Sequence, residues 1–319
     1  MAESVQSLKK RIKSVGNINK ITQAMELVAA TKMRRAQEIA LASRPYALTA
    51  LDLLANVSLV EHELPQLLKK RKVKNTLFVL MASDKGLAGA FNSSLLKRFE
   101  KYIATHKKEK EDFFIAIGEK TNAYLAKKGY NIVKKFVSVG DYTTTTQVQP
   151  LADFIVEGYL EKMWDKVIIF STHFKSALKQ EPLIREILPV NFESIKETIK
   201  EITPATGKFA DIIKEQNLDF GQNGPAFAKG SGEAREYLIE PSPKVVLEDL
   251  AKHLLFMQVY HLILEANASE HSARRMAMKT ASDNAKDLSE KLQLQYNKSR
   301  QAGVTTQIIE ITAGAESLN

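Results

Sequence analysis

The stretch PKVVLEDLAKHLLFMQVYHLILEANASEHSARRMAMKTASDNAKDLSEKLQLQYNKSRQA, residues 243–302, decides the fold of this chain. After Pro243 it contains neither glycine nor a further proline, the two residues that most disfavour a helix interior. Ser242 followed by Pro243 is a good helix start, because a capping hydroxyl precedes a proline at the first helical position. Apolar or small residues recur at intervals of four and three, namely Val246, Leu250, Leu254, Met257, His261, Leu264, Ala268 and His271, then Met278, Ala281, Ala285, Leu288, Leu292, Tyr296 and Ser299. This periodicity predicts one long helix, and its near-heptad stripe is typical of a coiled-coil strand.

The N-terminal segment, residues 3–62, carries the second long stripe and contains one glycine and one proline. Its apolar and small positions are Val5, Leu8, Ile12, Val15, Ile21, Met25, Val28, Ala29, Met33, Ala36 and Ala40. A helix over the whole segment would be about 85 Å long, with a kink expected at Pro45. We therefore predict that the two ends of the chain pair antiparallel. Small residues would let the backbones approach closely at Ala266, Ala268, Ser269, Ser272 and Ala273.

The middle of the chain has a different pattern. Short β-branched or aromatic runs predict strands at 76–82, 113–118, 131–136, 166–172 and 184–190. Helical stretches lie between them at 93–106, 120–128 and 149–162. Strands that alternate with helices indicate βαβ units and a mostly parallel sheet. The predicted fold class is α/β, a long antiparallel coiled coil of the terminal helices plus a Rossmann-like, mostly parallel α/β domain.

These patterns divide the chain into an N-terminal coiled-coil helix at 1–62, the Rossmann-like domain at 73–241 and a C-terminal coiled-coil helix at 242–319. Residues 192–236 begin with a charged helical pattern and become rich in glycine and polar residues, so we interpret them as an insertion in the sheet domain. Residues 237–240 are predicted to be a short return strand. Gly303 could end the last helix, and residues 304–311 have strand propensity, so the pattern leaves the conformation of that segment open.

Composition narrows the class of protein. Hydrophobic content of 44% and charged content of 26% are ordinary for a globular protein of 319 residues. The chain has no run of about 18 apolar residues, so no bilayer-spanning helix is expected, and the N-terminus lacks the apolar region of a secretory signal. Cysteine is absent, which excludes disulfides, thiolate metal ligands and a cysteine nucleophile. The net charge of +9 favours an anionic partner.

Two features could carry chemistry, and both have a simpler interpretation. Residues 83–90, SDKGLAGA, follow the first strand and precede a helix, where a doubly wound domain holds phosphate. The stretch matches neither GxGxxG nor the GxxxxGK[ST] loop, so a structural turn is favoured over a dinucleotide-binding enzyme. None of the histidines forms an HExxH pair, and His261 and His271 lie on the apolar stripe, as core histidines do. We expect no catalytic residue, cofactor or metal.

The first helix is strongly basic. Its cations are Lys9, Lys10, Arg11, Lys13, Lys20, Lys32, Arg34 and Arg35. A solvated helix face would account for them, and so would contact with an acidic partner. A nucleic-acid-binding coiled coil is the weaker alternative, because no aromatic residues are interleaved with the charge and no known reader motif is present.

Several segments resemble one family closely. Residues 11–37, RIKSVGNINKITQAMELVAATKMRRAQ, resemble the opening of the gamma subunit of bacterial-type rotary (F-type) ATP synthases. So do residues 268–285, ASEHSARRMAMKTASDNA, and the closing YNKSRQAGVTTQIIEITAGA at 296–315. The SDKGLAGAFN turn at 83–92 also matches a family element. The resemblance covers nearly the whole chain apart from the insertion.

The resemblance implies a central stalk. In this family the terminal helices form an asymmetric coiled coil inside a ring of three alpha and three beta subunits. The sheet domain lies near the epsilon subunit and the membrane c-ring, and rotation couples ion translocation to ATP synthesis or hydrolysis. Such a chain is a non-catalytic, peripheral subunit at the cytoplasmic face of the bacterial inner membrane, without direct membrane insertion or a nucleic-acid partner. The resemblance also implies that the last residues are helical.

The resemblance assigns partner contacts residue by residue. Met25 lies where the rod meets an acidic lever of a beta subunit, and positions that contact beta subunits or support the rod's neck are Arg274, Arg300, Gln301, Thr305 and Glu310. Ile18 and Gln23 stand where relatives often have threonine and lysine, and Glu316 and Ser317 make the tip more polar than in many relatives. The insertion at 192–236 has no cysteine, so thiol switching is excluded and a steric restraint on hydrolysis remains a hypothesis.

Overall fold

In the computed structural model, the residues described are 4–42, 53, 65–106, 111–137, 139, 143–190 and 239–316. They fall into two compact units: Met1–Ala29 with Arg274–Asn319, and Ala30–Ala273. We call these the rod unit and the sheet unit. The predicted kink at Pro45 and the insertion at 192–236 lie outside the described residues. The domain boundaries predicted from the sequence, at residues 62, 73 and 241, stay predictions.

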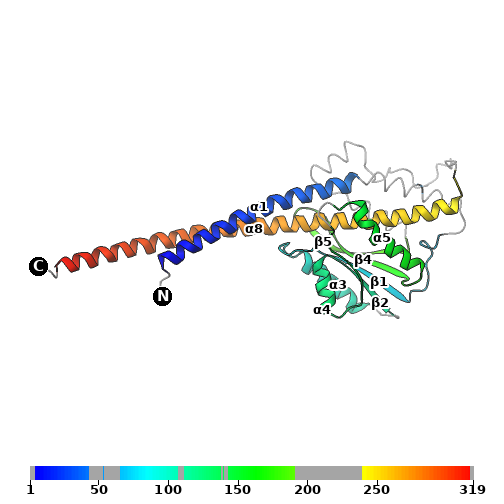
Figure 1. Ribbon diagram of the computed structural model, residues 1–319, viewed down its shortest axis with the longest axis horizontal. Helices are drawn as coiled ribbons and strands as arrows, with labels where there is room; N and C mark the ends of the chain where they lie inside the picture. The colour runs from blue at the N-terminus through cyan, green and yellow to red at the C-terminus, as the bar shows by residue number, and fades with distance from the viewer. Residues whose placement is uncertain are drawn as a thin grey trace. The chain divides into compact units, whose positions relative to one another are not determined.

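Two long helices contribute to both units (Figure 1): α1 spans Val5–Ala42 and α8 spans Pro243–Glu316. The start of α8 is as predicted, since the Val245 amide donates to Ser242 Oγ at 3.5 Å. Gly303 does not end the helix, so the segment 304–311 is helical, as the resemblance implied and against its strand propensity. Its threonines fit a helix because their hydroxyls donate to carbonyls one turn back, as Thr305 Oγ1 does to Gln301 O at 3.0 Å.

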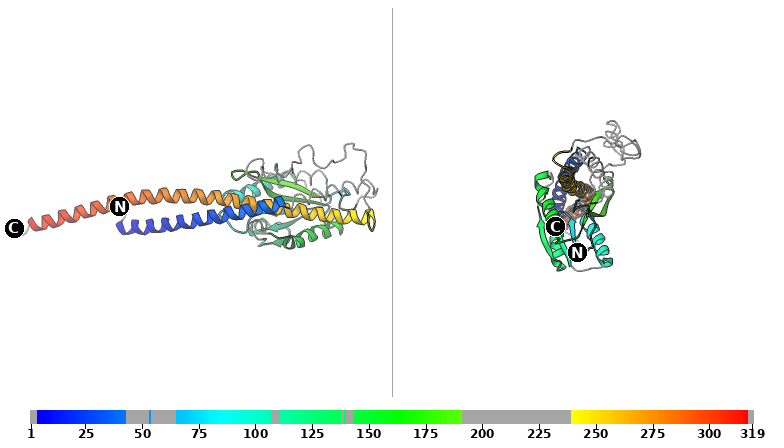
Figure 2. Two further views of the ribbon diagram at one scale, coloured as in Figure 1. Left: turned by 90° about the horizontal axis from the view of Figure 1, so that it is seen from above. Right: turned by 90° about the vertical axis from the view of Figure 1, so that its right-hand side faces the viewer.

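The rod unit is an antiparallel helix pair (Figure 2). α1 buries Leu8, Thr22 and Ala29, and the facing residues of α8 that are buried are Met278, Ser282, Ala285 and Leu292. Ser282 Oγ donates to Asn19 Oδ1 at 2.6 Å, which fixes the register of the two helices. Two residues of the stripe predicted for α1 do not lie in this seam: Ile21 is 59% exposed and Val28 is 53% exposed. Small and polar side chains occupy the seam at their level because they permit a closer approach of the two backbones.

In the described part of the sheet unit, five strands form a sheet in the order β3-β2-β1-β4-β5. Their bounds are β1 Asn75–Met81, β2 Glu111–Ile117, β3 Ile132–Phe136, β4 Lys166–Phe174 and β5 Gln180–Leu188. The first four strands run parallel, with Asn75 opposite Glu111 and Thr76 opposite Lys166, and β5 is an antiparallel edge strand. The predicted α/β class with a mostly parallel sheet is confirmed. No return strand includes Ile239 or Glu240, and the two residues before them lie outside the described ranges.

Helices cover both faces of the sheet (Figure 1). On one face α3 (Phe91–Thr105) and α4 (Glu119–Lys127) pack against Phe78, Leu80 and Phe114. On the other face α5 (Thr145–Leu160) and the first half of α8 cover Leu77 and Val79. Successive residues of a strand point to opposite faces, so continuous apolar runs are what a doubly covered parallel sheet requires.

The first half of α8 belongs to the core of the sheet unit, which the sequence pattern did not reveal. Leu247, Leu254, Leu255, Val259 and Leu262 are all 1% exposed or less. One of the small residues predicted to face the other long helix contacts the sheet instead: Ser269 Oγ donates to Thr172 O on β4 at 3.1 Å. α8 is therefore apolar nearly all round at this level because it is enclosed between the sheet and other helices.

Candidate functional site

The turn after β1 was the main sequence candidate for ligand chemistry. Ser83 Oγ donates to Lys85 O at 2.6 Å, and Asn92 Nδ2 donates to Ser83 Oγ at 2.7 Å. Asp84 Oδ1 accepts from the Glu119 amide at the start of α4 at 3.0 Å. The turn's side chains thus bind its own backbone and the next helix start, and a structural turn is the interpretation these contacts favour.

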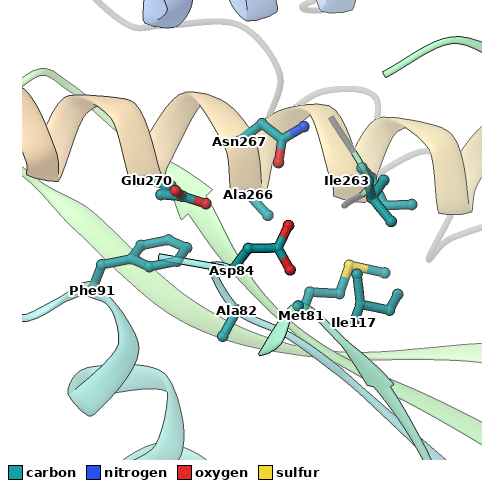
Figure 3. A pocket seen from close by; sticks show the side chains of 11 residues that line it. Met81, Ala82, Asp84, Phe91, Ile117, Ile263, Ala266, Asn267 and Glu270 are labelled. Atoms are coloured by element: carbon teal, nitrogen blue, oxygen red, sulfur yellow. The ribbon is translucent and has the colours of Figure 1, made fainter. Parts of the chain in front are cut away.

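A small cavity lies beside this turn, at the carboxyl ends of β1 and β2 (Figure 3). It is lined by Met81, Asp84 and Phe91 from the sheet side and by Asn267 and Glu270 from α8, among others. Its volume of about 30 Å³ matches one water molecule. A nucleotide does not fit such a space, so the cavity supports no dinucleotide site.

Other titratable groups are used in packing. His261 and His271 are 1% and 2% exposed, as expected of core histidines on the apolar stripe. His173 Nδ1 lies 3.2 Å from each carboxylate oxygen of Glu265, a buried pair that the sequence analysis did not identify. In the described ranges no three His, Cys, Asp or Glu side chains gather as metal ligands would. Among those same ranges, no helix combines the length and the apolar character needed to span a bilayer.

The partner-contact residues carried over from the family resemblance all lie in the rod unit. Met25 and Arg274 are half-buried. The bond between Asn19 and Ser282 sets an antiparallel register, so Met25, six residues after Asn19, is level with residue 276, six before Ser282 and two from Arg274. The remaining four, Arg300, Gln301, Thr305 and Glu310, are exposed on the last turns of α8. The first two therefore lie at nearly the same level of the helix pair, and the others are exposed along one helix end.

The rod unit also exposes many large apolar side chains, most of which the sequence analysis did not single out. On α1 these are Ile18, Ile21, Leu27 and Val28, and on α8 they are Leu288, Leu294, Val304, Ile308, Ile309 and Ile311. Val304, Ile308 and Ile311 follow one another at four and three residues and so share one helix face. Apolar side chains gathered in this way mark protein contact surfaces. The signal was available as periodicity, but periodicity does not distinguish a face that packs within the chain from one that packs elsewhere.

Most of the basic residues of α1 are exposed. Lys9, Arg11, Lys13 and Lys20 are exposed on the rod unit. Within the sheet unit Arg34 and Arg35 are exposed and Lys32 is half-buried, and Arg35 Nη1 lies 3.4 Å from Glu38 Oε2. Exposed cations beside exposed apolar residues suit a partner surface that is acidic and partly apolar.

Comparison with known proteins agrees with this arrangement. A sequence model of the family described as ATP synthase matches residues 4–318. The ATP synthase gamma chain of Halothermothrix orenii is 33% identical over 318 residues, covering 99% of each chain. The ATP synthase gamma chain of Opitutus terrae is 36% identical over 311 residues, covering 97% of each chain.

Solved structures share the fold. A chain of the Euglena gracilis mitochondrial ATP synthase rotor in rotational state 1 superposes with a TM-score of 0.59 at 16% identity, covering 94% of this chain and 98% of that one. A chain of the Tetrahymena thermophila mitochondrial ATP synthase central stalk and c-ring gives 0.55 at 21% identity, covering 82% and 99%.

Proposed function

This chain belongs to the family of ATP synthase gamma chains, which confirms the resemblance found in its sequence, and we propose that it works as the rotating central stalk of the complex. In this proposal the rod unit turns inside a head of three alpha and three beta subunits. The sheet unit connects it to the epsilon subunit and to the membrane c-ring. The observation that carries the proposal is the rod unit's display of apolar and basic side chains on a helix pair that has already formed its own seam.

The proposed role of the chain is mechanical and non-catalytic. The turn at 83–90, the main candidate for ligand binding, uses its polar side chains to hold its own backbone and the start of α4. The alternative of a dinucleotide-dependent enzyme is therefore disfavoured. That alternative requires the chain to bind a dinucleotide, and calorimetry would detect such binding. A nucleic-acid-binding coiled coil would be retained on DNA or RNA at low salt and released steeply as salt rises.

We assign the torque contacts to Met25, Arg274, Arg300, Gln301, Thr305 and Glu310, with the basic residues Lys9, Arg11, Lys13, Lys20, Lys32, Arg34 and Arg35 providing attraction to acidic levers. Arginine suits this task because its planar fork grips carboxylates or carbonyls with two hydrogen bonds. Each contact must break during every turn, so individual contacts should be weak; exposed ion pairs contribute about 0–1 kcal/mol.

The proposed location is peripheral, at the cytoplasmic face of the bacterial inner membrane. Two points support it: both relatives described above are bacterial gamma chains, and attachment through a c-ring requires no membrane-spanning segment of the chain's own.

Co-assembly tests the proposal. The purified chain alone should show no ATP hydrolysis, and mixing it with alpha and beta subunits of a bacterial relative should produce a stable complex with rotation-coupled hydrolysis. Failure to co-assemble would overturn the proposal.

The contact residues are tested separately. Arg300→Ala combined with Gln301→Ala should lower coupled activity several-fold while leaving the melting temperature of the free chain unchanged, since both side chains are exposed. Lys286→Ala, an exposed residue of α8 outside the proposed contacts, is the matched control. If the wild-type chain, the double variant and the Lys286→Ala control all showed equal coupled activity, the assignment of Arg300 and Gln301 as contact residues would be wrong. The co-assembly result would not be affected.

A further inference from the structure

Within the sheet unit, α8 is fixed by buried polar contacts as well as by apolar packing. Glu265 lies against His173 on β4, and Ser269 Oγ donates to Thr172 O on the same strand at 3.1 Å. Ser272 Oγ donates to Ala177 O at 2.9 Å, in the turn between β4 and β5, and accepts from Gln180 Nε2 at 3.2 Å. Apart from Gln180, which is half-buried, the side chains in these contacts are at least nine-tenths buried.

A second set of contacts holds the same helix at Thr143, which immediately precedes Thr144 and α5. Tyr260 OH donates to Thr143 O at 3.1 Å, and Asn267 Nδ2 donates to Thr143 Oγ1 at 2.9 Å. Thr143 is 1% exposed and Tyr260 is 6% exposed, so both groups lie inside the unit.

The two sets grip nearly opposite sides of α8. At about 100° per residue, Glu265, Ser269 and Ser272 fall within about 60° of one another around the helix axis. Tyr260 and Asn267 fall within about 20° of one another and are centred roughly 160° away from the first set. We call these five side chains, with their partners on β4, Gln180, Ala177 and Thr143, the polar clamp.

Directional contacts on opposite sides of a helix have a mechanical consequence. Apolar contact is non-directional, so a helix that turns or slides in an apolar groove loses little until its side chains collide. A hydrogen bond depends on distance and angle, and a buried polar group that loses its partner is costly. A slide of one residue along α8 moves each side chain by about 1.5 Å and about 100°, which breaks both sets together.

We propose that the polar clamp is the joint through which turning force passes between the sheet unit and α8. This inference rests on the proposed function, because only a rotating stalk loads such a joint. It assigns a role to Tyr260, Glu265, Asn267, Ser269 and Ser272 that is distinct from contact with the surrounding head. These are positioning residues, since they touch neither nucleotide nor ion.

Two double variants separate the two sides of the clamp. Ser269→Ala with Ser272→Ala removes the serine contacts to Thr172 on β4 and to the turn after it, and leaves Glu265 against His173. Tyr260→Phe with Asn267→Ala removes the side-chain contacts to Thr143. Glu265→Gln keeps an amide partner for His173 and serves as the conservative variant. Thr105→Ala is the matched control, since its hydroxyl donates to carbonyls of its own helix, α3.

The readout is torsional stiffness. The chain has no cysteine, so one cysteine introduced at the exposed Lys97 of α3 can carry an orientation probe on the sheet unit. With the complex of alpha, beta and this chain stalled on a surface, both double variants should show at least a twofold larger variance of the probe angle than wild type. ATP hydrolysis by that complex, which does not load the joint, should stay within about 30% of wild type. Gradient-driven ATP synthesis by the complete reconstituted enzyme should fall at least threefold. The Thr105→Ala and Glu265→Gln chains should match wild type in all three measurements.

The outcomes are distinguishable. Wild-type variance and wild-type synthesis in both double variants would overturn the clamp while leaving the proposed function intact. Parallel loss of hydrolysis and synthesis would also overturn it, because that pattern reports damaged folding or assembly. If the wild-type chain itself gives no coupled activity, the proposed function fails first. Should one double variant not fold, the other still decides the question, because each side of the clamp makes its own prediction.

Discussion

Replacing Gly158 with alanine tests how tightly the core between the sheet and α5 is packed. A Cβ built on Gly158 would lie 2.1 Å from Cζ2 and 2.3 Å from Cη2 of Trp164. Ordinary contact begins near 3.4 Å, so the indole would have to move by the difference between 3.4 and 2.1 Å, about 1.3 Å. It is not free to do so, because Trp164 is fully buried and its Nε1 donates to Ile155 O at 3.0 Å. The rings of Phe113 and Phe154 pack beside it.

Two opposing terms set the size of the effect. Alanine in place of glycine inside a helix gains about 1 kcal/mol of helix propensity. Overpacking a well-filled core costs about 1–3 kcal/mol, and a displacement beyond 1 Å belongs at the upper end. The expected net loss for the sheet unit is therefore about 2 kcal/mol, which lowers the melting temperature by about 4–8 °C for a unit of this size.

The measurement and its control come from the chain itself. Trp164 is the single tryptophan, so its fluorescence reports unfolding at the mutated site during a urea titration. Gly303 is the matched control, because it is also helical and a Cβ there meets nothing within 4 Å. Gly303→Ala should raise the stability of α8 by up to about 1 kcal/mol, which circular dichroism would measure. A Gly158→Ala chain as stable as wild type would show that the indole has room to move and that the packing argument is wrong.

Two further predictions concern side-chain contacts of the sheet unit. Burial, followed by the hydrogen bond to Glu100, raises the pKa of Tyr124, and burial raises the pKa of Tyr159 and Tyr260. The unfolded chain releases these protons near pH 10, while the folded chain keeps them to higher pH. This contribution to the free energy of unfolding is therefore complete below about pH 10 and is lost as pH rises above it. Ultraviolet titration of the phenolates checks the prediction, and a tyrosine signal completed near pH 10 would contradict it. Arg71 Nη2 donates to Tyr159 O at 2.8 Å while its Nε lies 2.7 Å from Asp165 Oδ1, so Arg71→Ala should cost about 3 kcal/mol in urea unfolding. Its exposed neighbour offers the control Lys72→Ala, expected within about 0.5 kcal/mol of wild type, and equal effects of the two changes would refute the role of the ion pair.

Much of the fold could be predicted from local pattern. Each of the five strands predicted between residues 76 and 190 exists within four residues of its expected ends, because β-branched and aromatic runs bounded by polar residues have few alternatives in a βαβ chain. The antiparallel direction of β5 could not be read from its residues. It follows from a short turn, in which the Lys179 amide donates to Ser176 O at 3.2 Å, a connection too short for the crossover that a parallel strand needs.

The candidate site was less predictable, for a physical reason. Ile21 and Val28 continue the apolar stripe of α1, yet they are exposed, because Asn19, Thr22 and Ala29 form the seam with α8. Hydrophobic periodicity identifies a helix face that needs cover but not what covers it. The buried pair of His173 and Glu265 was also missed, since its members are 92 residues apart and belong to no spacing motif.

A comparison of the two halves of α8 indicates that a partner covers the apolar face at its end. From Leu254 to Leu264 the helix is apolar nearly all round, and the sheet unit covers it completely. At Val304, Ile308 and Ile311 the apolar residues share one face, and they are 47%, 56% and 72% exposed. A chain that folds alone would gain solubility by placing polar residues on that face, as it does one turn earlier at Arg300. The apolar stripe at the end of α8 is therefore best explained by cover that comes from another subunit, as the proposed head of alpha and beta subunits would provide.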